Sequence, residues 1–263
     1  MNRRLTSETL VGRVLLLSVV VALLSASAAA GSEARAVGSA RDCRIVEWSG
    51  AAAAETPNWS DPENWVGGAR PGGCDVVRFG DTAFDSVVDA DFDGEIAGLI
   101  LDRGFSGTVR LRRTLRIDGE LVVAGGTLEQ GRSGIAAGNV LLAGGELDGG
   151  KASLQVGGAV TVTGGELTTP AGLMRVERLE IRAPGVVRMG RGGKLEMTAA
   201  REPLVGDGLL DTASNRPNSV EYTGGAPDDL TAAAPMIAAL GFGAPNASLP
   251  LYPSEGRLRA ALV

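Results

Sequence analysis

The apolar positions in the middle of the chain recur in a pattern that repeats every 19 to 20 residues. Three segments share the same order of apolar, polar and glycine positions, and their Gly-Gly pairs stand at 125–126, 144–145 and 164–165. A fainter fourth copy, residues 178–187, has Pro184-Gly185 at the glycine positions. Within each copy apolar and polar residues alternate, which is the pattern of short strands with one buried face. Repetition with a period of about 20 residues is typical of solenoid proteins.

Each repeat divides into three short pieces, most of which end in glycine or another small residue. Glycine at these ends supplies the positive φ that a sharp corner needs. Stacked coils of this kind pair their strands in parallel, at a spacing of about 4.8 Å. The sequence therefore predicts an all-β fold: a right-handed single-stranded parallel β-helix (β-solenoid) with 19–20 residues and three short strands per coil. Inward residues are expected to form continuous columns, made of Leu121, Val123, Leu128, Val140, Leu142, Leu147, Val160, Val162 and Leu167.

The chain divides into five predicted segments. They are a signal peptide (1–30), a flexible linker (31–42), a Trp-rich, disulfide-closed N-terminal cap (43–80), the β-solenoid (81–225) and an Ala/Pro-rich C-terminal cap or tail (226–263). Caps are expected because both ends of a solenoid expose unpaired strand edges. In the tail we expect a short helix from Asp228 or Asp229 toward Leu240, and a last strand over 257–263.

Residues 1–30 have the three parts of a secretory signal. Arg3, Arg4 and Arg13 make a positive region, residues 14–24 are an unbroken apolar run, and residues 25–30 offer the small side chains of a cleavage site. This run is too short to cross a bilayer, which takes about 20 apolar residues; a retained membrane anchor is the alternative. We expect a secreted bacterial protein, extracellular or at the cell surface, with the periplasm as the other location and no membrane span in the mature chain.

The composition restricts the kinds of bonds, sites and partners that the chain can have. Cys43 and Cys74 are an even pair, which in an oxidising compartment predicts one disulfide; two separate buried thiols are the alternative. The chain has no histidine, which excludes Ser-His-Asp and Cys-His catalysis and any His-ligated metal centre. The formal net charge is −6 and no basic stripe is visible along the sequence, so no nucleic-acid partner is expected.

The segment that opens the mature chain carries a distinctive set of residues. It reads Trp48-Ser49-Gly50, Asn58-Trp59-Ser60, Asn64-Trp65, Pro71 and Asp75-x-Val77-x-Phe79, followed by Ala97-Gly98-Leu99 and the Gly-Gly-x-Leu repeats. Over roughly residues 45–200 this order resembles secreted bacterial β-helix surface proteins with autotransporter-associated β-strand-type repeats. The resemblance implies a β-helix at the cell surface and brings no catalytic residues with it. The chain departs from the family pattern in having Cys74 just before Asp75.

Two groups of residues are candidate ligand sites. Trp48, Trp59 and Trp65 form either a platform that stacks on sugars or the small core of the cap. Asp89, Asp91 and Asp93 resemble half of a calcium loop, but Ile100 stands where an EF-hand has its twelfth-position Glu. Weak calcium binding is one interpretation of these aspartates. In the plainer one they point outward from a strand whose Ala90 and Phe92 point inward.

These observations favour a non-catalytic structural or adhesive element of the cell surface or extracellular matrix, with surface polysaccharide or other cell-surface proteins as partners. The alternatives are a carbohydrate-binding protein that uses the Trp-rich cap, and a polysaccharide lyase or hydrolase on the β-helix scaffold. For the enzyme, Glu129, Asp148 and Glu166 are expected at near-equivalent coil positions, as a site or as a charged edge that discourages aggregation. Lys151 and Lys194 lie two coils apart with no companion motif.

Overall fold

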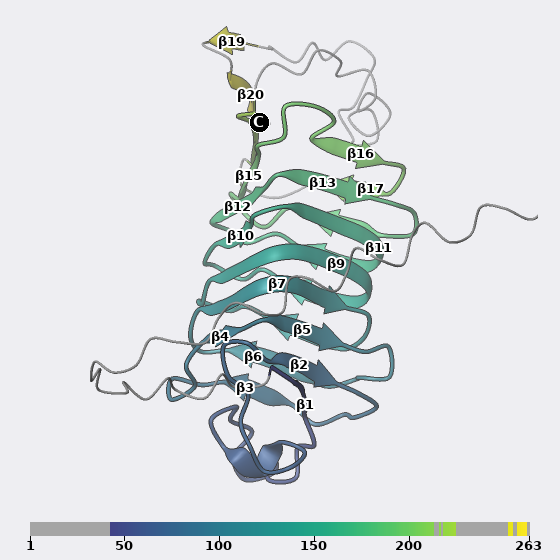
Figure 1. Ribbon diagram of the computed structural model, residues 1–263. Coiled ribbons are helices and arrows are strands. Elements are labelled where there is room, and N and C mark those ends of the chain that lie inside the picture. Colours follow the sequence, from purple (N-terminus) through teal and green to yellow (C-terminus); the bar gives the residue numbers. More distant parts are fainter. Residues whose placement is uncertain (1–42, 213–215, 217, 225–251, 255–256, 262–263) are drawn as a thin grey trace, which may run out of the picture. The chain divides into compact units, whose positions relative to one another are not determined.

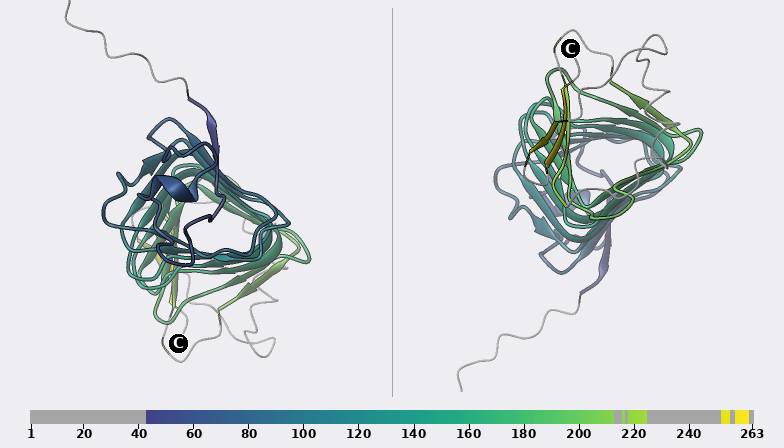
Figure 2. Two further views of the ribbon diagram at one scale, coloured as in Figure 1. Left: turned by 90° about the horizontal axis from the view of Figure 1, so that it is seen from below. Right: turned by 90° about the horizontal axis from the view of Figure 1, so that it is seen from above.

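The computed structural model describes residues 43–212, 216, 218–224, 252–254 and 257–261. Within these residues strand follows strand, and the one helical segment is a short 3-10 helix, η1 (Pro62–Asn64). Figure 1 shows the strands stacked as the coils of a parallel β-solenoid with about seven turns. Viewed along the stack, the coils have the outline of a triangle (Figure 2). The predicted fold class is confirmed.

Three parallel sheets form the sides of the triangle, and the long strands β7 (Leu115–Val123), β9 (Ile135–Asp148) and β11 (Ala159–Thr168) turn a corner and contribute to more than one side. Side A contains, in order, β1 (Ile45–Glu47), β2 (Val76–Phe79), β5 (Gly98–Leu101), β7, β9, β11, β13 (Arg178–Ile181) and β16 (Leu204–Gly206). Side B contains β3 (Ser86–Val88), β6 (Thr108–Leu111), β8 (Thr127–Glu129), β9, β11, β14 (Val186–Arg188) and β17 (Leu209–Asp211). Side C contains β4 (Glu95–Ile96), β7, β9, β10 (Leu154–Val156), β12 (Leu173–Val176), β15 (Lys194–Met197) and β18 (Ser219–Tyr222).

The interior of the coils is filled by columns of aliphatic side chains. On side A, Leu121 pairs with Val140 and Val140 with Val160. On side B, Leu128 pairs with Leu147, and the next coil continues the column. All nine residues predicted to line these columns are buried. Each such Val or Leu contributes about 1.5–3 kcal/mol by leaving water, so the columns supply the main attraction between coils.

The coil length predicted from the repeats holds only in the middle of the solenoid. There Leu128 pairs with Leu147, at the same spacing as the first two glycine pairs. Nearer the ends the coils are longer, as the pairing of Leu99 with Leu121 and that of Leu179 with Leu204 show. The additional residues lie between strands, so the ladder stays in register while the sequence period is lost.

The parallel ladder begins before the boundary predicted at residue 81. β1 already pairs with β2, and β2 pairs with β5, so the cap is a loop of residues 48–75 inserted between two strands of side A. At the other end, β20 (Arg257–Ala261) is the last strand expected over 257–263, and it runs antiparallel to β18 and to β19 (Tyr252–Ser254). The predicted signal peptide, linker and tail helix lie outside the described residues.

Stacked glycines form the corner between sides A and B. The second glycine of each predicted pair is left-handed, with φ of 61° at Gly126, 62° at Gly145 and 73° at Gly165. A Cβ atom on Gly145 would lie 2.5 Å from the carbonyl oxygen of Gly126 in the coil below. Glycine is therefore required twice over, by the backbone conformation and by the close approach of the neighbouring coil.

We expect Gly145→Ala to lower the free energy of unfolding by about 1–3 kcal/mol or more, because the left-handed conformation alone costs that much for alanine. Gly157→Ala is the matched control: its φ is outside the left-handed region, and its Cβ would lie 3.9 Å from the nearest backbone oxygens. Urea denaturation of both variants checks the prediction. Equal midpoints for the two variants would contradict the stacked corner.

Candidate functional site

The three tryptophans are packed inside the N-terminal turns. Trp48, Trp59 and Trp65 are 4%, 0% and 2% exposed. The Trp59 and Trp65 ring centroids are 5.5 Å apart in an edge-to-face arrangement, and Trp59 also lies against Phe79 and Phe92. A sugar platform needs an exposed ring face, which these residues do not present. The geometry supports the predicted cap core, and the sugar-stacking interpretation of the tryptophans is corrected.

Buried polar groups hold the cap in shape around these rings. The indole Nε1 of Trp65 donates to the carbonyl oxygen of Trp59 at 2.8 Å, and that of Trp59 to the Ser86 hydroxyl at 3.1 Å. The buried Asn64 amide donates to the carbonyl oxygens of Thr56 and Asn58, and its oxygen accepts from the Ala52 N–H. Asn64, Trp59 and Trp65 of the opening motif therefore stabilise the fold of the cap.

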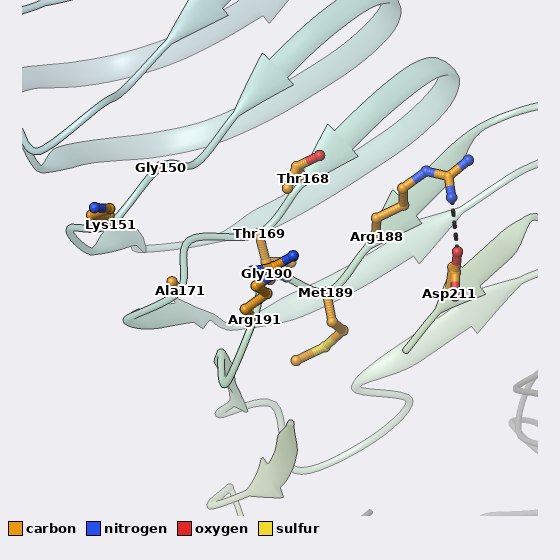
Figure 3. Close-up of a pocket in the computed structure, with 10 residues that line it drawn as sticks. All are labelled: Gly150, Lys151, Thr168, Thr169, Ala171, Arg188, Met189, Gly190, Arg191 and Asp211. Atoms are coloured by element: carbon orange, nitrogen blue, oxygen red, sulfur yellow. Dashed lines mark hydrogen bonds and ion pairs between the residues drawn. The ribbon is translucent and has the colours of Figure 1, made fainter. Parts of the chain in front are cut away.

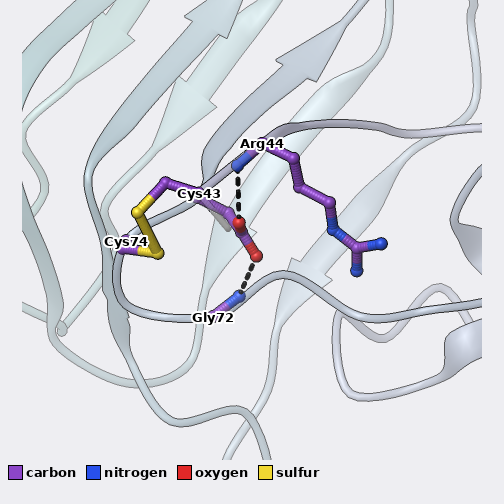
Figure 4. The surroundings of a disulfide bond; sticks show 5 residues. Cys43, Arg44, Gly72 and Cys74 are labelled. Atoms are coloured by element: carbon purple, nitrogen blue, oxygen red, sulfur yellow. Dashed lines mark hydrogen bonds between the residues drawn. A yellow bond between two sulfur atoms is a disulfide. The ribbon is translucent and has the colours of Figure 1, made fainter. Parts of the chain in front are cut away.

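The predicted disulfide between Cys43 and Cys74 is present, and it ties the starts of β1 and β2 together (Figure 4). The two Cα atoms are 5.2 Å apart across a sequence separation of 31 residues. Beside it, the Asp75 carboxylate accepts the N–H of Arg44 at 3.0 Å and that of Gly72 at 2.8 Å. A disulfide of this kind indicates an oxidising, non-cytoplasmic environment.

Loss of the disulfide is expected to destabilise the N-terminal turns. The double variant Cys43→Ser/Cys74→Ser should unfold with a free energy lower by roughly 2–4 kcal/mol, since the unfolded chain gains the freedom of a loop of this length. Guanidinium titrations with and without reductant measure the effect. Reductant should lower the wild-type midpoint and leave the variant unchanged; a wild type indifferent to reductant would contradict the prediction.

The three aspartates of the predicted calcium segment do not converge. They lie in a turn between β3 and β4, where Asp91 and Asp93 are exposed and Asp89 is buried. Ala90 is exposed, so the predicted alternation along a strand is also wrong, although Phe92 does point inward. In the described part of the chain no three carboxylate, cysteine or histidine side chains gather to hold a metal ion. The calcium loop is not formed.

Asp89 instead fastens the cap to the solenoid. Its carboxylate accepts the Ser60 N–H at 3.0 Å and the Asp91 N–H at 2.9 Å. Burial by itself raises the pKa of Asp89, but the hydrogen bond from Ser60, followed by that from Asp91, outweighs it and lowers the pKa below the ordinary value. The charged form is therefore favoured in the folded protein. This contribution is present above the unfolded pKa of about 3.9 and is lost as the pH falls through the lower, folded pKa.

Asp89→Asn should lower the free energy of unfolding at neutral pH by about 1–2 kcal/mol, because the amide oxygen accepts less strongly than the carboxylate. The difference from wild type should shrink as the pH falls below about 4. Chemical denaturation across this pH range measures it. Asp93→Asn, at an exposed position, is the control and should stay within about 0.5 kcal/mol of wild type. A pH-independent difference would contradict the assigned role.

The acidic residues considered for an enzyme fall into two columns on side B. Glu129 pairs with Asp148 and Asp148 with Thr168, whereas Glu166 pairs with Glu146. Glu166 directly follows the second glycine of its repeat, as Glu146 does, so the prediction that it shares a column with Glu129 and Asp148 is wrong. Lys151 lies at the corner between sides B and C, whereas Lys194 on side C bonds Glu221 and Glu196. The structure does not bring these five residues to one place.

Two arginines each pair with one acidic residue of these columns and with one acidic residue outside them. Arg110 contacts Asp85 at 2.8 Å and Glu129 at 3.0 Å. Arg188 contacts Glu166 at 2.7 Å and Asp211 at 2.9 Å. These pairs are substantially exposed, so they add little to stability individually, but they offset the repulsion between stacked carboxylates.

A hollow of about 620 Å³ lies at the corner between sides B and C (Figure 3). Lys151 and Arg191 stand on either side of Ala171, and the Arg188–Asp211 pair lies at the side B margin. Met189 and Thr169, both buried, are part of the floor. The short side chain of Ala171 leaves the space between the two cations open.

The same corner carries a column of cations that the sequence analysis missed. On side B, five residues pair with one another from coil to coil: Arg110, Glu129, Asp148, Thr168 and Arg188. The residues three positions after each of these are, in the same order, Arg113, Arg132, Lys151, Ala171 and Arg191. The backbone bonds from Lys151 N to Gly131 O and from Ala171 N to Gly150 O carry the register across the corner. The repeat spacing that marks the glycine pairs would have revealed this column if applied to charged residues. The expectation that no basic stripe exists is corrected.

No protein-family model, curated protein or solved structure matches the chain. The part of the chain that the structure describes has no helix with the length and hydropathy of a membrane span.

Proposed function

We propose that the protein is exported and acts as a non-catalytic structural or adhesive element at the cell surface or in the extracellular matrix. The supporting observation is a continuous three-sided ladder whose first strands are joined by a disulfide. Such a scaffold holds its surface residues at fixed intervals and needs no internal motion. That property suits a protein that presents a static surface to polymers or neighbouring cells.

The opening motif supports the same proposal. Its tryptophans, Asn64 and Asp75 each have a structural task in the cap or beside the disulfide. A motif that closes the first coil of a solenoid is consistent with the resemblance to secreted β-helix surface proteins, which remains part of the proposal. The leader-like residues 1–30 are the remaining support for export.

Export is tested with the full chain expressed in a bacterial host. We expect wild-type protein in the extracellular or surface fraction, with Cys43 and Cys74 oxidised, and retention in the cytoplasm when residues 1–30 are deleted. Fractionation, thiol labelling and protease treatment of intact cells give the readouts. Wild-type protein confined to the cytoplasm with free thiols overturns the proposal.

The non-catalytic part is tested on the purified protein. Uronate polymers with and without calcium should show no new double bonds or reducing ends after incubation. Turnover that is abolished by heat denaturation would replace the structural role with that of a polysaccharide lyase or hydrolase. Attachment of cells that carry the protein, compared with cells that lack it, then measures the adhesive role.

A further inference from the structure

We propose that the cation column at the corner between sides B and C binds a linear anionic polysaccharide running along the solenoid axis. This inference rests on the proposed surface function and names the chemistry of its partner. The residues that carry it are Arg132, Lys151 and Arg191, with Arg113 one coil earlier and the hollow at Ala171 between the last two cations.

Three cations of the column have exposed side chains that are available to bind a ligand. Arg132, Lys151 and Arg191 are exposed, and among the described residues none of them takes part in a salt bridge, whereas Arg110 and Arg188 on the adjoining side do. Arg113 is half-buried and donates to the carbonyl oxygens of Ala90 and Phe92. It therefore adds positive charge to the column, and the other three residues are left to make direct contacts.

The spacing of the column favours a polymer over a small anion. Adjacent coils lie about 4.8 Å apart, so the corner presents one position per coil at a constant rise. This rise is comparable with the length of one sugar unit in an extended chain, which would bring carboxylate or sulfate groups opposite successive cations. The hollow at Ala171 gives room for a sugar ring between Lys151 and Arg191 (Figure 3).

The chemistry of the hollow favours a sugar over a nucleic acid. Proteins that bind single strands combine basic residues with aromatic side chains on which bases stack. Besides the cations, the described lining includes Gly150, Thr168, Thr169, Gly190 and Met189. Its one carboxylate, on Asp211, is paired with Arg188, and no aromatic residue is among the described lining. A nucleic acid is an outcome that the test distinguishes.

Binding is measured with the full purified chain on immobilised polygalacturonate and on a sulfated glycan, with neutral dextran and oligo-dT as the other probes. We expect both acidic glycans to bind, with an affinity that falls as salt rises because the contacts are charged. Arg132→Gln/Lys151→Gln/Arg191→Gln should weaken binding roughly tenfold or more, since a few well-placed charge contacts are removed together.

The matched control is Arg44→Gln/Arg103→Gln/Arg178→Gln, which makes the same change in net charge at exposed positions away from this corner. It should stay within about twofold of wild type, because nonspecific attraction to exposed charge is weak and screened. Ala171→Leu fills the hollow without changing the charge and should also weaken binding, because the space for a sugar ring is lost. Equal urea denaturation midpoints for wild type and the variants exclude misfolding as the explanation of the results.

Equal weakening by the two triple variants, or no glycan binding at all, overturns the cation column as a site. Preferential binding of oligo-dT overturns the choice of a polysaccharide. A protein that is exported and promotes attachment but binds none of the probes overturns this inference alone. A protein retained in the cytoplasm overturns the proposed function, whatever polymers it binds.

Discussion

The structure depends on the registered stacking of each coil on the next. Backbone hydrogen bonds set the rise between coils, and within that rise each inward Leu or Val lies on its counterpart, as Leu121, Val140 and Val160 do. No single coil covers its own apolar residues, so the columns exist only as a cooperative stack. The same register governs the surface. Acidic columns, the arginines that offset them and the cations of the next corner all follow from it.

The middle of the solenoid could be predicted from the sequence because there the coils have nearly constant length. The glycine pairs, the strand alternation and the nine column residues are direct consequences of that regularity, and all appear in the structure. The lengths of the first and last coils could not be predicted, because residues inserted at the corners change the sequence period without changing the pairing of the strands. The early ladder strand β1 was hidden for a similar reason, since a whole cap separates it from β2.

The candidate sites were harder to predict, because whether a residue can bind a ligand depends on whether its side chain faces solvent or the core. Clustered tryptophans have the same spacing whether they face sugar or core, and only the packing of Trp59 against Phe79 and Phe92 separates the two cases. Asp89 stands in a series of aspartates but is turned inward, where its carboxylate accepts the N–H of Ser60 in the cap and that of Asp91 in its own turn. The cation column was in principle readable, since its members obey the repeat. Charged residues separated by whole coils give no local signal, however, and they become neighbours only after the coils are stacked.

The two short strands that cover the end of side C have a consequence for how the protein meets other copies of itself. A parallel ladder ends in a row of N–H and C=O groups ready to accept another strand of the same direction, and this invites end-to-end growth into fibres. On side C the outer edge of β18 is occupied by β20, which runs the opposite way. β19 is antiparallel to β20 and forms the edge beyond it, and its Pro253 has no backbone N–H to donate to a second solenoid docking there. The last coil strand of side C is thus covered by two short strands, and the proline at the new edge discourages polymerisation along that side.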